Sequence, residues 1–574
     1  MLASCTVPAR RRRRPTYDRS VPESPEIAYF TMEIALEDAI PTFSGGLGVL
    51  AGDYLRSAAD GALPLVAVTL LYRGGYFRQE VDEAGEQTET PVEWEPGELL
   101  EALEETVTVE VDGRPVTLGA WRYDLQGITG AVVPVYFLDA DREENDSKAR
   151  QLTDRLYSGD KAHRLRQEVL LGLGGVELLR RLGHAPGKYH MNEGHSALLV
   201  LRLLEEEEAA AVRERCVFTT HTPVPAGHDR FELPLVRQVL GEERTGQLRA
   251  LGCLETGELN MTELGIAGSG YVNAVSRRHG EVTAEMFPGV EVTSVTNGVH
   301  VGTWAGPSFA LLYDRHLSGW RERNELLRYA SCIPIVEIEQ AHREEKQRLL
   351  DQVVDRSGRH LDASALTIGV ARRATPYKRT TLILSDTERL VSMAKETGPI
   401  QIIFAGKAHP DDRGGKELLE EIVGESARLA GELQVVFLED YDLRLASLLV
   451  AGCDIWLNTP EKPNEASGTS GMKAAVNGVP SLSVLDGWWI EGCLDGLTGW
   501  AIGSLDEGDD AESLYDRLER RVLPSFYGSP NGLGELRRAA ISINGSFFNT
   551  ERMAREYARF AYGIAPGQPS LRQP

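Results

Sequence analysis

The stretch that decides the fold is LTIGVARRATPYKR, residues 366–379. Its first six residues form an apolar run, rich in β-branched side chains, with the length of a buried strand. Its last eight residues carry four cations, Arg372, Arg373, Lys378 and Arg379. In parallel α/β sheets the strands are apolar, and ligands bind at their carboxyl ends. The stretch therefore predicts a buried strand that ends in a candidate anion site, although the cation cluster alone also suits a solvated charged loop.

Similar apolar runs recur on both sides of this stretch, and amphipathic segments such as 341–357 and 415–432 separate them. The predicted strands are 27–32, 63–72, 216–220, 292–296, 366–371, 400–406, 433–438, 454–458 and 481–485. Alternation of strands and helices predicts an α/β protein with doubly wound domains. Two such domains, with a break near 331–336, would enclose a cleft between them.

Composition limits the partners of the chain. Its 574 residues are 42% hydrophobic and 26% charged, which is typical of a globular protein. The net charge of −25 disfavours nucleic acid and anionic membranes as partners. No apolar run reaches the roughly 18 residues of a membrane span. Scattered cysteines without metal-ligand spacing indicate a reduced, cytoplasmic protein, and the arginine-rich segment 1–25 is interpreted as a disordered basic tail.

A glycine-rich loop, SGGLGVLAGDYL, spans residues 44–55. Gly45, Gly46 and Gly48 open a predicted helix, so their backbone N–H groups could face a phosphate or a sugar oxygen. A lone glycine loop often marks only a tight turn. The glycine loop therefore indicates a ligand-binding site only in combination with other motifs.

Three polar turns follow predicted strands of the first half, and they supply Glu193, His195, His221, His228, Asn297 and His300. None of the histidines has metal-ligand spacing, so no metal site is predicted. Histidine and asparagine suit hydrogen bonds to sugar hydroxyls, although structural hydrogen bonding is the more common role. Tryptophans could stack on sugar faces or pack in the core; they are Trp304, Trp488 and Trp489.

Lys473 lies in EASGTSGMKAAVNG, residues 465–478, near the expected start of a helix. The positive end of a helix dipole repels a lysine there. The dipole and burial would both lower the pKa of its amine and make it a nucleophile toward an aldehyde. The alternative is a surface lysine beside a turn.

The segment EASGTSGMK resembles the pyridoxal-phosphate lysine motif of the α-glucan phosphorylases, which usually reads EASGTGNMK. Further blocks along the chain resemble the family and occur in the same order as in its members. They are 260–282, VTNGVHVGTW, RRATPYKR, FAGKAHP and SVLDGWWIEG. The resemblance extends from about Ile27 to about Trp500. It implies a GT-B architecture, with two Rossmann-like domains facing across a cleft, and reversible phosphorolysis of α-1,4-glucans to α-D-glucose 1-phosphate.

The resemblance also implies pyridoxal 5′-phosphate as cofactor, with its phosphate exchanging a proton with the substrate phosphate. Lys473 matches the lysine that carries this group. The catalytic residues implied are Lys473, Arg373, Lys378, Glu465 and His221. Those implied to bind the cofactor are Lys473, Lys378, Thr469 and Tyr441, and those for phosphate are Arg372, Arg373, Lys378, Gly45 and Gly46. The sugar-binding residues implied are Asn297, His221, His195, Glu465, Ser467 and Gly468. Tyr76 and Asp53 lie in matching blocks without an assigned role.

Several departures point to the short bacterial type of the family. Ser470 and Gly471 replace the usual Gly-Asn, Arg372 stands where longer members have lysine, and no segment resembles their regulatory N-terminus. Allosteric control is therefore not expected. The implied domains are a glucan-binding domain (26–330), a cofactor-binding domain (331–545) and a C-terminal helix and tail (546–574) that crosses back. The sequence leaves the oligomeric state open between a monomer and a homo-oligomer.

Two other functions compete with phosphorolysis. Sugar-nucleotide glucan synthases of the same fold often carry two glutamates eight positions apart at this turn, whereas Glu465 is followed eight positions later by Lys473. An ammonium group has no acceptor for ribose hydroxyls, so this alternative is disfavoured. A non-catalytic glucan-binding homologue is the second alternative, and the retained basic residues argue against it.

Overall fold

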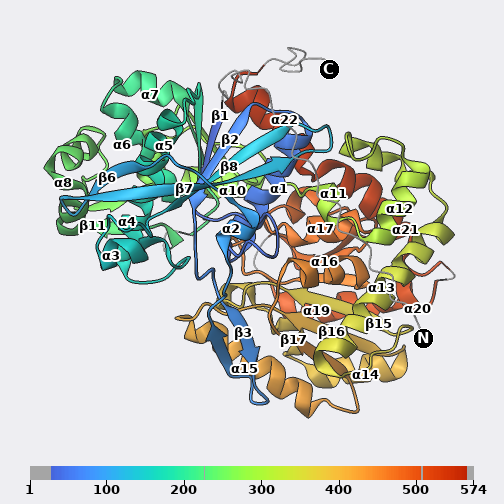
Figure 1. The fold of residues 1–574 in the computed structure, drawn as a ribbon. Coiled ribbons are helices and arrows are strands. Elements are labelled where there is room, and N and C mark those ends of the chain that lie inside the picture. Colours follow the sequence, from blue (N-terminus) through green and yellow to red (C-terminus); the bar gives the residue numbers. More distant parts are fainter. Residues whose placement is uncertain (1–26, 225–226, 506–507, 530, 565–574) are drawn as a thin grey trace, which may run out of the picture.

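A computed structural model describes residues 27–224, 227–505, 508–529 and 531–564. The predicted basic tail lies outside these residues, as does 565–574. Figure 1 shows two sheets flanked by helices, one built from the first half of the chain and one from the second. The five cysteines of the described part are free thiols. No helix there is long and apolar enough to cross a membrane.

The first sheet has parallel strands in the order β14-β13-β10-β9-β1-β2-β8. They are β14 (Thr293–Ser294), β13 (Tyr271–Ala274), β10 (Cys216–Thr219), β9 (Lys188–Asn192), β1 (Ile27–Thr31), β2 (Leu65–Leu70) and β8 (Val132–Asp139). Three antiparallel strands extend it, namely β7 (Arg114–Gln126), β5 (Glu101–Ala102) and β6 (Val107–Val111). The strand order reverses between β1 and β9, and ligands of such sheets bind where the order reverses.

The second sheet is entirely parallel, in the order β17-β16-β15-β18-β19-β20. Its strands are β17 (Gln434–Leu438), β16 (Ile400–Ala405), β15 (Leu366–Ala371), β18 (Ile455–Asn458), β19 (Ser481–Val484) and β20 (Gly499–Ile502). This is the strand order of the Rossmann fold. Its order reverses between β15 and β18, so the strand and basic loop of residues 366–379 lie at that position.

The prediction of an α/β protein with parallel sheets is confirmed. Each of the nine predicted strands overlaps a strand of the structure, and β15 has the predicted bounds. The predicted helices correspond to α13 (Ile335–Ser357) and α15 (Arg413–Arg428). The antiparallel strands were not predicted. The proposed domain boundaries stay a prediction.

The last described helices pack against α1 (Gly46–Asp60). Helix α22 (Thr550–Glu556) contacts α1, and Tyr557 of the following π-helix η10 (Tyr557–Ala561) lies against Tyr54 of α1, with ring centroids 5.6 Å apart. Buried hydrogen bonds join Tyr54 Oη to Tyr562 Oη at 2.6 Å and Ser57 Oγ to Thr550 Oγ1 at 2.6 Å. In Figure 1 the red α22 accordingly lies beside the blue α1.

A buried ionic cluster stabilises the second sheet at the end opposite to its candidate site. Asp454, just before β18, accepts hydrogen bonds from Lys346 at 2.6 Å and from His342 and Arg537 at 2.9 Å. Burial alone would raise the pKa of Asp454, but these neighbours outweigh it and hold the pKa well below its usual range. The carboxylate therefore stays charged inside the core.

Candidate active site

The two positions at which strand order reverses lie against each other. Gly45 follows β1 as the N-cap of α1, and Arg373 follows β15. A Cβ atom added to Gly45 would lie 3.5 Å from Nη2 of Arg373, which is van der Waals contact. The glycine loop of the first sheet and the basic loop of the second therefore meet, although 328 positions separate the two residues in the sequence.

Within the basic loop, Arg373 differs from its neighbours. Arg372 donates to the carbonyl oxygen of Leu457 at 2.8 Å, and burial lowers its pKa to about 10. Arg379 donates to the carboxylate of Asp510 at 2.6 Å. Arg373 has no hydrogen bond or ion pair with any residue that the structure describes, and its side chain is exposed. Its guanidinium group is therefore free to bind an anion.

The remaining cation of the basic loop, Lys378, forms an ion pair with Glu465. Both side chains are mostly buried, at 15% and 14% exposure. Glu465 is held in turn by its backbone N–H, which donates to Asp486 at 2.9 Å, and burial raises the pKa of Asp486 to about 6. Gly468 sits against Glu465 with a φ of +82°, a conformation that favours glycine. The turn 465–468 thus presents the carboxylate of Glu465 in an ion pair with Lys378 of the basic loop.

Lys473 lies at the middle of the seven-residue helix α17 (Ser470–Val476). Its ammonium group lies 3.9 Å from the centroid of the Trp304 ring, and Trp304 donates to Asp53 at 2.7 Å. No hydrogen-bond acceptor for the amine is found within the described residues. Burial lowers the pKa of Lys473 to about 8, against the opposing charge of Asp53. Burial rather than the dipole of so short a helix is the main cause.

Sequence reasoning missed Glu33, which organises the glycine loop. Its Oε2 accepts from the backbone N–H groups of Ser44 at 2.7 Å and Gly45 at 3.2 Å, and its Oε1 accepts from the Tyr157 hydroxyl at 2.9 Å. The N–H of Gly45 is therefore already used, whereas space above Gly46 is open. Glu33 directly follows the apolar run of β1, and this position was the only signal in the sequence.

Three residues of the predicted sugar pocket carry buried polar atoms that no described residue satisfies, namely His195 Nδ1, Ser467 Oγ and Asn297 Oδ1. The segments that carry Ser467 and Asn297 are tied together. The Ser276 hydroxyl donates to the carbonyl oxygen of Ala466 at 2.6 Å, and the Asn297 N–H donates to Val275 at 3.0 Å. Buried polar groups normally have partners, so these three atoms point to a polar ligand.

His221 and His195 follow strands of the first sheet, and both are held by acceptors. Nε2 of His221 lies 2.6 Å from Asn192 Oδ1, and Nε2 of His195 lies 3.4 Å from Asp229. Burial lowers the pKa of each histidine to about 3. Both rings are therefore neutral near pH 7, which suits hydrogen bonding to hydroxyls.

The remaining predicted residues lie around this centre. Thr469 is the N-cap of α17, and its carbonyl accepts from the Lys473 N–H at 3.2 Å. Tyr441 follows β17, where burial raises the pKa of its hydroxyl and Arg372 opposes that rise. Tyr76 has a similarly raised pKa, and Arg373 opposes it. Of the two alternatives for the tryptophans, core packing is the one that the structure shows, since all three are buried: Trp304, Trp488 and Trp489.

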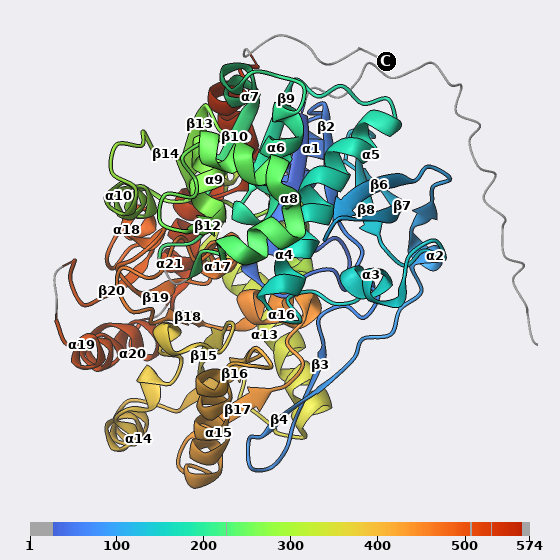
Figure 2. The same cartoon turned by 90° about the vertical axis from the view of Figure 1, so that its left-hand side faces the viewer.

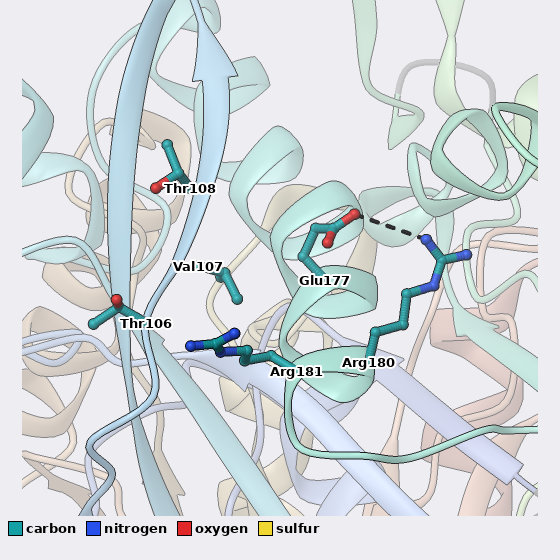
Figure 3. A pocket seen from close by; sticks show the side chains of 6 residues that line it. All are labelled: Thr106, Val107, Thr108, Glu177, Arg180 and Arg181. Carbon is teal, nitrogen blue, oxygen red and sulfur yellow. Dashed lines mark ion pairs between the residues drawn. The ribbon is translucent and has the colours of Figure 1, made fainter.

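An open hollow on another part of the first half is shown in Figure 3. Its lining residues are Thr106, Val107, Thr108, Glu177, Arg180 and Arg181. None of them is a predicted site residue, and two are already paired, since Glu177 and Arg180 lie 3.8 Å apart. The hollow is therefore no part of the candidate site.

Comparison with known proteins places these features in a family. Residues 228–493 match the family model described as carbohydrate phosphorylase. The chain is 38% identical to the maltodextrin phosphorylase of Thermococcus litoralis over 95% of its own length and 72% of that protein. It is 37% identical to the glycogen phosphorylase of Mycobacterium tuberculosis, over 95% of the chain and 71% of the relative. The glycogen phosphorylase of Aquifex aeolicus is 34% identical, over 93% and 86% respectively.

Proposed function

The chain belongs to the α-glucan phosphorylase family, and we propose that it catalyses the reversible phosphorolysis of α-1,4-glucans to α-D-glucose 1-phosphate with pyridoxal 5′-phosphate as cofactor. The observation that carries the proposal is a pair of cationic groups that have no hydrogen bond or ion pair with any described residue. The free guanidinium of Arg373 would take phosphate, and the buried amine of Lys473 would take the cofactor.

The residues present fit the cofactor. Lys473 would hold it covalently, because its amine is buried, lacks an acceptor among the described residues and has a pKa of about 8. Lys378, Thr469 and Tyr441 would complete the binding site. When bound, pyridoxal 5′-phosphate would supply a phosphate group that exchanges a proton with the substrate phosphate.

The basic and glycine loops would bind the substrate phosphate. Two unit charges about 4 Å apart repel by about 4 kcal/mol at an effective dielectric constant of about 20. Fixed cations must therefore offset the repulsion between two phosphates, and Arg373 and Lys378 would do so. The open N-terminal turn of α1 at Gly46 would add backbone N–H donors. Arg372, whose Nη1 and Nη2 groups donate to Lys378, Leu457 and Asn458, would orient the loop rather than bind phosphate.

The glucosyl unit would lie between the two sheets. Glu465, Ser467 and Gly468 would contact it from the second half of the chain, and Asn297, His221 and His195 from the first. Neutral histidines and unsatisfied oxygens suit hydroxyl groups. A backbone carbonyl and the phosphate itself would stabilise an oxocarbenium-like transition state, so the paired carboxylates of glycosidases are not required.

The arrangement proposed for this chemistry is a GT-B fold with a cleft between residues 26–330 and 331–545, and with 546–574 returning to the first domain. The two sheets with Rossmann strand order and the contact between Gly45 and Arg373 support it. We propose a cytoplasmic location, since the relatives are enzymes of glucan metabolism by name.

The test is an assay of the purified chain with α-1,4-glucan and inorganic phosphate. Formation of glucose 1-phosphate, and glucan extension in the reverse direction, is expected. Incubation with ADP-glucose or UDP-glucose in place of glucose 1-phosphate is the control. Glucan extension from a sugar nucleotide, without phosphorolysis, would support the synthase alternative, and glucan binding without either reaction would support a non-catalytic homologue.

A further inference from the structure

A two-stranded hairpin joins the two halves of the molecule. Among the described strands, β3 (Arg78–Val81) and β4 (Gln87–Thr90) pair only with each other. Figures 1 and 2 show this blue hairpin leaving the first sheet and lying beside α15 and β17 of the second. Its tip is in close contact there, because a Cβ atom on Gly85 would lie 2.5 Å from the backbone of Glu420.

The hairpin contacts the second half through two buried glutamines, Gln79 and Gln87, which are 2% and 4% exposed. The Gln87 side chain donates to the carbonyl of Ala408 and accepts from the Ala408 N–H, both at 3.0 Å. Gln79 donates to the carbonyl of Gly406 at 2.9 Å and accepts from the Asp440 N–H at 2.9 Å. The two amide side chains therefore pair with backbone amides as a neighbouring strand would.

The backbone that the glutamines bind is packed directly on the basic loop. Ala374, the residue after Arg373, forms a β-bridge with Ala408, and its N–H donates to Lys407 at 3.1 Å. Gly406 lies so close to Arg372 that a Cβ atom on it would be 1.9 Å from the Arg372 carbonyl oxygen. A shift of 406–408 would therefore move the backbone that carries Arg373.

The hairpin is also continuous with the other side of the site. Lys407 Nζ donates to the carbonyl of Phe77 at 2.9 Å, and Phe77 lies between Tyr76 and β3. The segment 76–90 thus runs from the first sheet to the loop that supports the basic cluster. At its outer side a more exposed ion pair joins Lys416 and Glu89 at 2.7 Å.

We propose that the hairpin is a clasp between the two halves, and that Gln79 and Gln87 are positioning residues for phosphate binding. By fixing 406–408 they hold Arg373 against the glycine loop at Gly45. This inference rests on the proposed function, because it assumes that Arg373 binds the substrate phosphate. The buried amides fix the loop, whereas the outer ion pair contributes little.

The test uses the full-length chain with Gln79→Met and Gln87→Met, which keep side-chain length but remove the hydrogen bonds. The KM for phosphate should rise by about 10- to 100-fold, which is the effect expected when the Arg373 guanidinium is misplaced by about 1 Å. The KM for glucan should change by less than about twofold. Hydrogen exchange at the Ala374 and Ala408 amides should become faster. Lys416→Met, which removes only the outer ion pair, is the matched control and should change neither. If the double variant does not fold, Gln87→Met alone is the second variant.

If hydrogen exchange at the Ala374 and Ala408 amides is unchanged in the glutamine variants, the proposal that the hairpin is a clasp is overturned. Faster exchange with equal rises in both KM values would overturn the positioning of the phosphate site. If the unmodified protein shows no phosphorolysis, the proposed function fails instead, and the exchange measurement still decides whether the glutamines hold the loop.

Discussion

Replacing Arg373 by alanine removes the basic-loop side chain that has no partner among the described residues. Since it makes no hydrogen bond or ion pair there, its loss should leave the fold almost unchanged. In the complex it would donate charge-assisted hydrogen bonds to phosphate, which are each worth about 1.5–3 kcal/mol. Because about 1.4 kcal/mol is a tenfold change in binding, we expect the KM for phosphate to rise by about 10- to 150-fold. The KM for glucan should change little.

Initial rates measured while phosphate and glucan are varied separately would check this prediction. Arg373→Lys should give an intermediate value, because lysine keeps the charge but loses the planar fork. Arg413→Ala removes the same charge from a side chain that is 92% exposed and should have no effect. Equal changes in both KM values, or an equal effect of the Arg413 variant, would refute the reasoning.

Further predictions concern three buried residues, Lys473, Asp454 and Gly48. In the cofactor-free chain, borohydride trapping of a pyridoxal aldehyde at Lys473 should increase with pH and be half-maximal near pH 8, because the neutral amine reacts; a midpoint near 10.5 would contradict burial. The lowered pKa also means that the buried charge destabilises the fold below about pH 8, and that this cost is relieved as the pH rises toward 10.5. Asp454→Asn should lower the free energy of unfolding by about 3–5 kcal/mol in urea titrations, since it leaves Lys346 without a carboxylate partner and Arg537 with Glu339 alone. A loss below about 1 kcal/mol would count against the cluster. The stability supplied by Asp454 should be present above its unfolded pKa of about 3.8 and be lost as the pH falls below it. Gly48→Ala should impair folding or phosphate binding, because its Cβ would lie 2.8 Å from Glu33 Oε2, whereas Gly45→Ala meets only ordinary contacts.

Much of the fold could be predicted because its signals are local. The strand at 366–371 is apolar throughout and ends at a charged loop, and the structure has it at those residues. The antiparallel strands lack this signal, because β6, for example, alternates buried and exposed residues and is not a continuous apolar run. Strand β8 contains Pro134, which also weakens its strand signal.

Within the candidate site, the motif residues were predictable but their contacts were not. Arg372 and Arg373 look equivalent in the sequence, yet one is tied to Leu457 and the other faces Gly45. The contact of Lys473 with Trp304, and that of Gln79 with Gly406, join residues that are far apart in the chain. No periodicity or motif encodes such pairs, because they arise only when the two halves pack together.

The most direct test of the central claim is peptide mapping of the purified chain after borohydride reduction. The account predicts a pyridoxyl group on the peptide that contains Lys473, and its loss in a folded Lys473→Ala variant that has no phosphorolytic activity. A chain that carries out phosphorolysis while Lys473 remains unmodified would contradict it.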